Sequence, residues 1–184
     1  MISYEGRKTR LRPLRRDDMA SSLRWRNDPE VREQVFGYRF PVTEQMEAKW
    51  YDSVLEDQSR SRVVFAIEVL DGDALIGFVQ LLQIDWISRR CSFGITIGER
   101  RYQGQGLAAD CMHLLFRYAF ECLNLRKISL EVAVYNRAAL NLYRKFGFTE
   151  EGVLKEHVFL EGVYHDVVVM RLLASEYATR VTNA

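Results

Sequence analysis

Alternation of apolar and polar residues, or a short unbroken apolar run, predicts seven strands along the chain. They are Thr9–Leu14, Arg62–Leu70, Ala74–Ile84, Arg90–Ile97, Lys127–Val134, Phe148–Leu154 and Tyr164–Leu172. Asp71-Gly72-Asp73 is a hairpin turn signal between the second and the third. The three successive strands in the middle of the chain therefore predict an antiparallel meander. The last two strands are expected to be joined through His157–Glu161 and a turn at Glu161-Gly162.

Apolar residues at helical spacing predict five helices. They run from Asp17 to about Arg26, after Pro29 to about Phe36, from Thr43 through Leu55, and over Leu107–Leu123 and Asn136–Phe146. Asp17 and Thr43 are the expected N-caps, and Gly147 is expected to end the last helix. Met46, Trp50 and Val54 form the apolar side of the third helix. This order of elements indicates a mixed α/β fold and not a uniform βαβ repeat.

Length and composition indicate a single domain over residues 1–184. The chain is 48% hydrophobic and 28% charged, as in ordinary soluble proteins, and we find no repeat or linker. No apolar run approaches the ~20 residues that span a bilayer, and the N-terminus has no apolar signal core. A cytoplasmic protein without a membrane partner is therefore expected. Cys91, Cys111 and Cys122 lack Cys-x-x-Cys spacing and are expected to be reduced thiols.

Net charge and residue spacing argue against two classes of ligand. A net charge of +1 argues against nucleic-acid binding, and no set of histidines and carboxylates has metal-ligand spacing, so no metal is expected. The charge is uneven, however. Residues 1–40 hold ten Lys and Arg against six Asp and Glu, an excess of four positive charges.

The residues from Phe93 to Ala108 form a predicted strand, a glycine-containing loop and the start of a helix. Such a loop directs backbone N–H groups and a helix N-terminus at one point, which suits a pyrophosphate. Gly104 and Gly106 allow close approach, and Arg100 and Arg101 add positive charge.

The same loop also fits a competing motif. Gly104-x-Gly106-x-x-Ala109 matches the dinucleotide-binding fingerprint, with Glu131 near the position of its ribose-binding acid. That fold needs several further βαβ units. Only about 75 residues follow the motif here, with one more helix and then a hairpin. We therefore reject the dinucleotide-binding interpretation.

The chain resembles the GNAT superfamily of acyl-CoA-dependent N-acyltransferases. The resemblance rests on Arg101-x-x-Gly104-x-Gly106 at a strand-to-helix junction, followed by a strand, Asn136, Tyr143 and Lys145-Phe146-Gly147-Phe148. Asn136–Gly152 and the closing Gly162-x-Tyr164-x-Asp166 are typical of the branch of ribosomal-protein N-terminal, spermidine and amino-sugar acetyltransferases. The resemblance covers about residues 7–173, the expected core. It implies the GNAT fold, a mixed, mostly antiparallel central sheet with splayed strands at the acetyl-CoA site and helices on both faces.

The resemblance also implies acetyl-CoA as the donor and assigns its site. Backbone amides near Ile95 and Ile97 would bind the pantetheine arm and polarise the thioester carbonyl, and the strand of Ile95 would splay from that of Val132. Tyr143 would be the general acid that protonates the leaving CoA thiolate. The remaining positions implied for donor binding are Arg101, Gln103, Gly104, Gln105, Gly106, Leu107 and Asn136.

The acceptor and its base are less determined by the sequence. Glu131 is the candidate base, with a surface glutamate as the alternative. Trp25 is a candidate for stacking on a sugar ring, and Arg26 for pairing an anion, so a nucleotide-linked amino sugar ranks first among small-molecule amines. The positive excess disfavours spermidine, although Asp57–Arg60 and Leu82–Trp86 are similar to stretches in spermidine enzymes.

Two further alternatives stay open at this point. The acceptor could be a protein N-terminus. The chain could also be a non-catalytic acyl-CoA sensor with the same fold, although its intact Tyr143 and Asn136 argue against that. A homodimer is expected by analogy with the family.

Overall fold

The computed structural model describes residues 4–35 and 39–182. In the N-terminal half the elements are β1 (Tyr4–Glu5), β2 (Thr9–Pro13), η1 (Arg16–Asp18), α1 (Met19–Asn27), α2 (Pro29–Gln34), α3 (Glu44–Leu55), β3 (Val63–Val69), β4 (Leu75–Asp85) and β5 (Arg90–Ile97). They are followed by η2 (Arg100–Tyr102), α4 (Leu107–Arg117), the π-helical turn η3 (Tyr118–Cys122), β6 (Lys127–Ala133), α5 (Arg137–Phe146), β7 (Thr149–Leu160), β8 (Val163–Leu173) and α6 (Ala174–Thr182).

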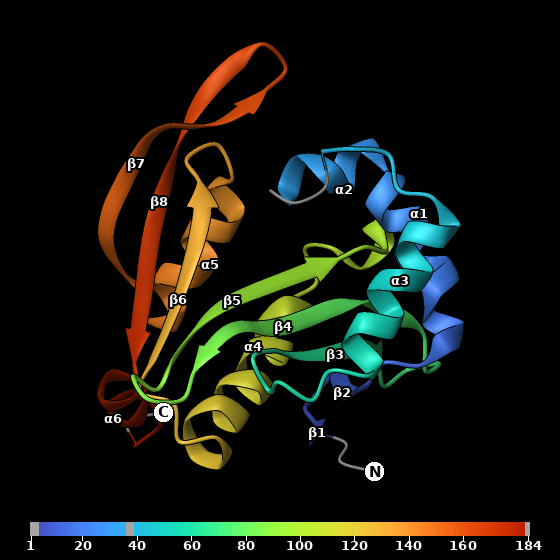
Figure 1. The fold of residues 1–184 in the computed structure, drawn as a ribbon. Coiled ribbons are helices and arrows are strands. Elements are labelled where there is room, and N and C mark those ends of the chain that lie inside the picture. Colours follow the sequence, from blue (N-terminus) through green and yellow to red (C-terminus); the bar gives the residue numbers. More distant parts are fainter. Residues whose placement is uncertain (1–3, 36–38, 183–184) are drawn as a thin grey trace. The chain divides into compact units, whose positions relative to one another are not determined.

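The strands are hydrogen-bonded in the order β1-β2-β3-β4-β5-β6-β8-β7, an open and mostly antiparallel sheet (Figure 1). The predicted α/β fold class is confirmed. The chain forms two compact units, described separately below. The first unit comprises the residues up to Leu82 together with Gly94–Tyr118, and the second comprises Gln83–Phe93 and the residues from Ala119 onward.

In the first unit, helices cover both faces of the sheet (Figure 1). On one face, Ala66 of β3 and Phe78 of β4 are buried in an apolar cluster with residues of the N-terminal helices and of the segment that leads to them. Those partners are Leu14, Trp25, Val31 and Tyr51. The next residue of a strand points to the opposite face, and Phe65 there makes an edge contact with Tyr118 at the end of α4, with ring centroids 5.5 Å apart.

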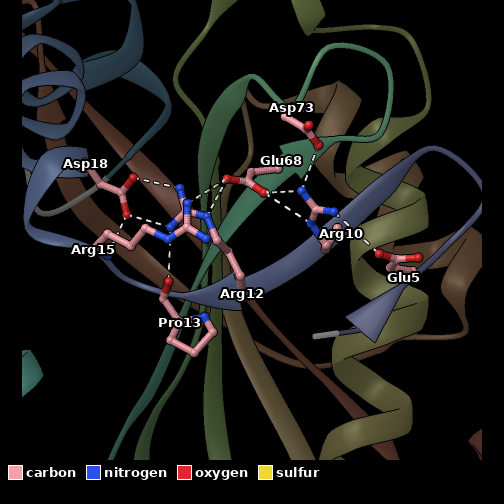
Figure 2. Close-up of polar contacts among 8 residues, drawn as sticks. All are labelled: Glu5, Arg10, Arg12, Pro13, Arg15, Asp18, Glu68 and Asp73. Carbon is pink, nitrogen blue, oxygen red and sulfur yellow. Dashed lines mark hydrogen bonds and ion pairs between the residues drawn. The ribbon is translucent and has the colours of Figure 1, made fainter. Parts of the chain in front are cut away.

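A buried ion-pair network joins β2 and β3 to the start of α1 (Figure 2). Arg12 donates to Asp18 at 2.7 and 2.8 Å and also pairs with Glu68, while Arg10 donates to the second Glu68 oxygen at 2.8 Å. Arg12 and Glu68 are each only 4% exposed. Burial alone would raise the pKa of Glu68, but the two guanidinium groups lower it below the ordinary value. A buried carboxylate is stable only with such partners, so this network fixes β2 against β3.

The second unit is built on the β7–β8 hairpin (Figure 1). β6 pairs with β8 in an antiparallel register from Lys127↔Leu173 to Ala133↔Val167. β5 and β6 are parallel, and their ladder covers three pairs, from Arg90↔Lys127 to Ser92↔Ser129. Both strands continue beyond these pairs, to Ile97 and Ala133.

Several predictions about the helices need correction. The N-cap of α1 is Asp18 and not Asp17, and the Asp18 side chain does not cap the helix, because its carboxylate binds Arg12 and the backbone N–H of Arg15. Thr43 does cap α3, but that helix buries Glu47 and Tyr51, whereas Met46 is 52% exposed. Trp50 and Val54 of the predicted apolar side do pack against this core, whereas the polar Glu47 is buried because polar partners satisfy it. The predicted end of the second helix at Phe36 lies outside the described residues.

The boundaries in the second half of the chain also differ in part. The predicted helix over Leu107–Leu123 leaves α-helical geometry after Arg117 and continues as η3. β7 runs to Leu160, where a connection was predicted, with a register shift between Leu154 and Val158 and with Glu156 at φ of 49°. α5 follows the prediction, since Asn136 is its N-cap and Gly147 ends it in the left-handed conformation, with φ of 94°.

Candidate active site

The loop after β5 has a backbone suited to bind an anion. Gly104 and Gly106 have φ of 74° and 78°, in the left-handed region that glycine tolerates best. A Cβ on Gly104 would meet nothing within 4 Å, so the space beside it is open. Gly106 is the N-cap of α4, and no side chain caps this helix. The first N–H groups of α4 therefore have no side-chain partner at the cap, which is the arrangement that binds phosphates at helix N-termini.

Two glutamine side chains hold this loop in shape. Gln103 donates from Nε2 to the carbonyl oxygen of Ile97 at 2.9 Å. Gln105 donates to the carbonyl oxygen of Arg101 at 2.6 Å. Both side chains are thus engaged with loop carbonyls, which favours a role in shaping the loop. Their predicted contact with the donor would have to come from the backbone.

The two arginines of the loop differ in their surroundings. Arg100 pairs with Glu30 of α2. The guanidinium of Arg101 lies over the ring of Tyr102, 4.9 Å from its centroid, and pairs with no carboxylate in the described part of the chain. Arg101 is therefore the arginine of this loop whose charge is available to a phosphate.

The N-terminal helices fasten the start of the same loop. Trp25 of α1 donates from Nε1 to Oε1 of Glu99 at 3.1 Å, and Arg24 pairs with the same carboxylate. A Cβ on Gly98 would lie 2.1 Å from the indole, so the backbone at that residue packs directly against the ring. Trp25 is 3% exposed. A ring this buried offers no face for stacking, so the structure argues against the interpretation of Trp25 as a sugar platform.

Arg26 is likewise engaged within the first unit. Its Nη1 donates to Oε2 of Glu47 at 2.8 Å, and its guanidinium lies 5.4 Å from the centroid of the Trp50 ring. Glu47 is fully buried and also accepts a hydrogen bond from Ser22 at 2.5 Å. The charge of Arg26 thus balances a buried carboxylate, and its predicted role in pairing a substrate anion has no support here.

In the second unit, α5 carries Asn136 and Tyr143. The Asn136 Oδ1 atom accepts the backbone N–H of Ala139 at 3.1 Å, so this side chain caps the helix. Tyr143 makes an edge contact with Phe93, with ring centroids 6.1 Å apart, and a tilted contact with Phe148. Burial raises the pKa of Tyr143 to about 12. The phenol therefore keeps its proton at any physiological pH, as a general acid requires.

Glu131 lies on the exposed side of β6, opposite Val169 of β8. The neighbouring positions Leu130 and Val132 are buried, which confirms the predicted alternation. Glu131 has no hydrogen bond or ion pair within the described residues. Its carboxylate is available for proton transfer, and its role as a base stays a prediction.

Sequence reasoning missed two residues at the loop. Lys8 donates from Nζ to the carbonyl oxygen of Gln105 at 3.0 Å, and Asp110 in the first turn of α4 accepts the backbone N–H groups of Arg7, Lys8 and Thr9. An acidic residue in the first turn of a helix is a recognisable signal. Its partners are about 100 residues away in sequence, and nothing in the local pattern identifies them.

Comparison with known proteins identifies the family. The model of the acetyltransferase (GNAT) domain matches residues 8–149. The chain belongs to the GNAT acetyltransferase family. It is 35% identical over 170 residues to spermidine N(1)-acetyltransferase of Vibrio cholerae, covering 92% of this chain and 95% of that protein.

Solved structures agree with this assignment. The crystal structure of spermidine N-acetyltransferase from Vibrio cholerae in complex with CoA and spermine has a TM-score of 0.85 and 33% identity, covering 92% of this chain and 98% of the other. A dodecameric structure of the same enzyme has a TM-score of 0.79 and 33% identity, covering 94% of this chain and 97% of the other. The GNAT protein described here is thus an acetyl-CoA-dependent N-acetyltransferase.

Two classes of site or segment are not found in the described part of this GNAT protein. No group of three or more His, Cys, Asp or Glu side chains there is placed to hold a metal ion. No helix of that part is long and apolar enough to cross a bilayer.

Proposed function

We propose that this acetyltransferase transfers the acetyl group of acetyl-CoA to a primary amine of a spermidine-type polyamine. The observation that carries the proposal is the 35% identity to spermidine N(1)-acetyltransferase, because it extends over 95% of that enzyme. The match therefore includes the part of the fold that would bind the acceptor, in addition to the donor-binding motif. The CoA and spermine complex with its TM-score of 0.85 supports the same acceptor class.

The structure weakens the argument against a polyamine that rested on the positive charge of residues 1–40. Arginines within residues 1–40 are matched by carboxylates from elsewhere in the chain. The pairs are Arg10–Glu68, Arg12–Glu68, Arg16–Asp52, Arg24–Glu99 and Arg26–Glu47. The excess of four positive charges along the sequence is therefore not an excess of free positive charge in space. The amino-sugar interpretation rested on Trp25 and Arg26, and both are engaged in internal contacts.

We place the acetyl-CoA donor at the loop before α4. The open space at Gly104 and the uncapped N-terminus at Gly106 suit its pyrophosphate, with Arg101 supplying charge. Backbone groups near Ile95 and Ile97 would hold the pantetheine arm. Both residues lie at the end of β5, next to this loop.

The chemistry requires proton transfers at the amine and at the thiolate. The amine is an ammonium ion near neutral pH and must first lose a proton. The neutral nitrogen then attacks the thioester carbonyl carbon, its second proton passes to water, and the C–S bond breaks to release the thiolate. Glu131 would accept the proton that the amine loses, directly or through water, and Tyr143 would donate its phenolic proton to the thiolate. The raised pKa of Tyr143, about 12, fits the second role.

Transfer is proposed to be direct, without an acetylated enzyme. Burial raises the pKa of Cys91 and of Cys111 to about 12, so both thiols remain protonated and are poor nucleophiles. The third cysteine, Cys122, is exposed. A Cys122→Ser enzyme should retain its kcat, whereas an acetylated cysteine trapped during turnover would contradict direct transfer.

Thiol release from acetyl-CoA over a panel of acceptors tests the proposed function. The panel holds spermidine, spermine, a nucleotide-linked 4-amino sugar and a peptide that begins with Ala or Ser. We expect kcat/KM for spermidine to exceed that for the sugar and the peptide by at least about tenfold, since a site built for one amine discriminates by its polar contacts. A higher kcat/KM for the sugar or the peptide would reject the polyamine.

Donor placement is tested separately by CoA binding. Gly106→Val should abolish binding, because its φ of 78° is strained for a β-branched residue. Gly72→Val in the hairpin turn is the matched control, since Gly72 has φ of 84° and open space but lies outside the loop. Equal CoA affinity in both variants would reject the placement.

Three broader expectations remain part of the proposal: a homodimer in solution, a cytoplasmic location and a single cooperative domain. Light scattering coupled to size exclusion tests the first. A single unfolding transition seen by two spectroscopic probes tests the third.

A further inference from the structure

Asp110 pins the chain segment before β2 to the first turn of α4. Its Oδ2 atom accepts the backbone N–H groups of Lys8 at 3.0 Å and Thr9 at 2.8 Å, and the Thr9 hydroxyl at 2.7 Å. Its Oδ1 atom accepts the N–H of Arg7 at 3.1 Å. Burial would raise the pKa of Asp110, but these hydrogen bonds lower it below the ordinary value. The carboxylate is thus charged and its oxygens are occupied by the backbone of one short segment.

This attachment brings the side chain of Lys8 to the donor loop. Its Nζ atom donates to the carbonyl oxygen of Gln105 at 3.0 Å and lies 3.8 Å from where a Cβ of Gly106 would be. An ammonium group has three N–H donors, and the described residues use one of them. No carboxylate lies within 4.0 Å of this ammonium among those residues. A cation without a counter-charge among those residues therefore lies beside Gly106.

We propose that Lys8 is a further donor-binding residue, whose ammonium group contacts the pyrophosphate of acetyl-CoA, and that Asp110 is the positioning residue that holds Lys8 at the loop. The inference rests on the proposed placement of the donor at Gly104–Leu107. The sequence motif of the loop does not include either residue, because Lys8 lies just before β2 and Asp110 lies inside α4.

The lysine ammonium and the loop N–H groups complement each other in binding a pyrophosphate. A lysine ammonium is a compact point charge that binds phosphate from many directions, whereas the loop N–H groups fix the direction. The hydrogen bond to the Gln105 carbonyl keeps the ammonium at the loop before the donor arrives, so less side-chain freedom is lost on binding. Asp110 itself does not repel the phosphates strongly, since four donors already satisfy its oxygens.

Steady-state kinetics of Lys8→Met tests the inference. We expect the KM for acetyl-CoA and the Kd for CoA to rise about tenfold, the effect of losing one exposed charge-assisted contact, with kcat unchanged. Lys8→Arg should restore most of the affinity. Lys49→Met, which removes an exposed lysine of α3 in the same unit, should change neither constant.

A truncated donor separates phosphate binding from loop stability. S-acetylpantetheine lacks all phosphates, so its kcat/KM should be the same for wild type and Lys8→Met. Added salt should weaken CoA binding to the wild type more than to the variant, because screening acts on the charge that the variant lacks. An equal loss with both donors would mean that Lys8 only shapes the loop, and would overturn the inference.

Asp110→Asn tests the positioning role through a double-mutant cycle. Alone it should raise the KM for acetyl-CoA severalfold, and in the Lys8→Met background it should add little, because it acts through Lys8. Additive effects would overturn the assignment of Asp110. If Lys8→Met leaves the KM unchanged while Gly106→Val abolishes binding, the inference fails and the donor placement stands. If neither variant weakens binding, the placement itself fails.

Discussion

Trp25 donates its indole N–H to the Glu99 carboxylate, 3.1 Å away, at the residue where the strand β5 gives way to the donor loop. The same ring packs on the backbone of Gly98. Trp25, which the sequence suggested as a residue that stacks on the substrate, thus supports the donor loop. Trp25 belongs to the packing that shapes this loop, so substitutions of Trp25 should weaken acetyl-CoA binding.

Trp25→Phe removes this hydrogen bond and part of the ring that supports Gly98. We expect the free energy of unfolding to fall by about 2 kcal/mol and the KM for acetyl-CoA to rise about tenfold, since a small displacement of a binding loop is costly. Trp50→Phe is the control, because Trp50 packs in the same core without contacting Glu99. Chemical denaturation and steady-state kinetics measure both effects. An equal rise in KM in both variants would contradict the specific role of Trp25.

Glu68→Gln leaves Arg12 buried with only part of its counter-charge. We expect the free energy of unfolding at pH 7 to fall by about 3 kcal/mol, the cost of breaking a buried ion pair. Because the folded pKa of Glu68 is lowered, its stabilisation is present above the unfolded pKa of about 4.3 and is lost as pH falls through the folded value. Urea denaturation should therefore show a difference between wild type and variant that shrinks below about pH 4. A difference that stays constant down to pH 2 would contradict the assignment.

Tyr143→Phe removes the proposed general acid and keeps the ring contacts with Phe93 and Phe148. We expect kcat to fall about a hundredfold, the low end for acid catalysis, because a thiolate is already a fair leaving group. The KM for acetyl-CoA should stay within about twofold, since the change acts in the transition state. The wild-type rate should show no alkaline decline up to about pH 10, because the pKa of Tyr143 is about 12. An unchanged kcat in the variant would reject this role.

Glu131→Gln tests the proposed base. We expect kcat/KM for spermidine at pH 7 to fall about a hundredfold and to recover partly as pH rises, because more of the amine is then already neutral. Glu121→Gln, at an exposed glutamate of the same unit, is the control and should behave as the wild type. A variant with wild-type rates across pH 6–9 would identify Glu131 as a surface residue.

The sequence was most informative where local chemistry determines structure. The turn at Gly72, the cap at Thr43 and the left-handed end of α5 at Gly147 were predicted because each needs a particular residue type. The glycine loop before α4 belongs to the same class. Its φ values at Gly104 and Gly106 follow from a motif within three residues.

Prediction failed where partners far apart in sequence decide the outcome. Glu47 is buried because Ser22 and Arg26 satisfy it, and a hydrophobic pattern has no way to show that. The net charge of the first 40 residues misled for the same reason, since the matching carboxylates come later in the chain. Lys8 went unnoticed because its partner Asp110 is recognisable only once the fold is known.

A competition experiment tests the central claim most directly. Acetyl-CoA is supplied in limiting amount to the enzyme with equal concentrations of spermidine, a nucleotide-linked 4-amino sugar and an Ala-starting peptide, and the products are identified by mass spectrometry. Product ratios then report the ratios of kcat/KM. The account predicts that monoacetylated spermidine is the main product. Acetylated sugar or peptide as the main product, or no acetylated acceptor from an enzyme that binds acetyl-CoA, would contradict it.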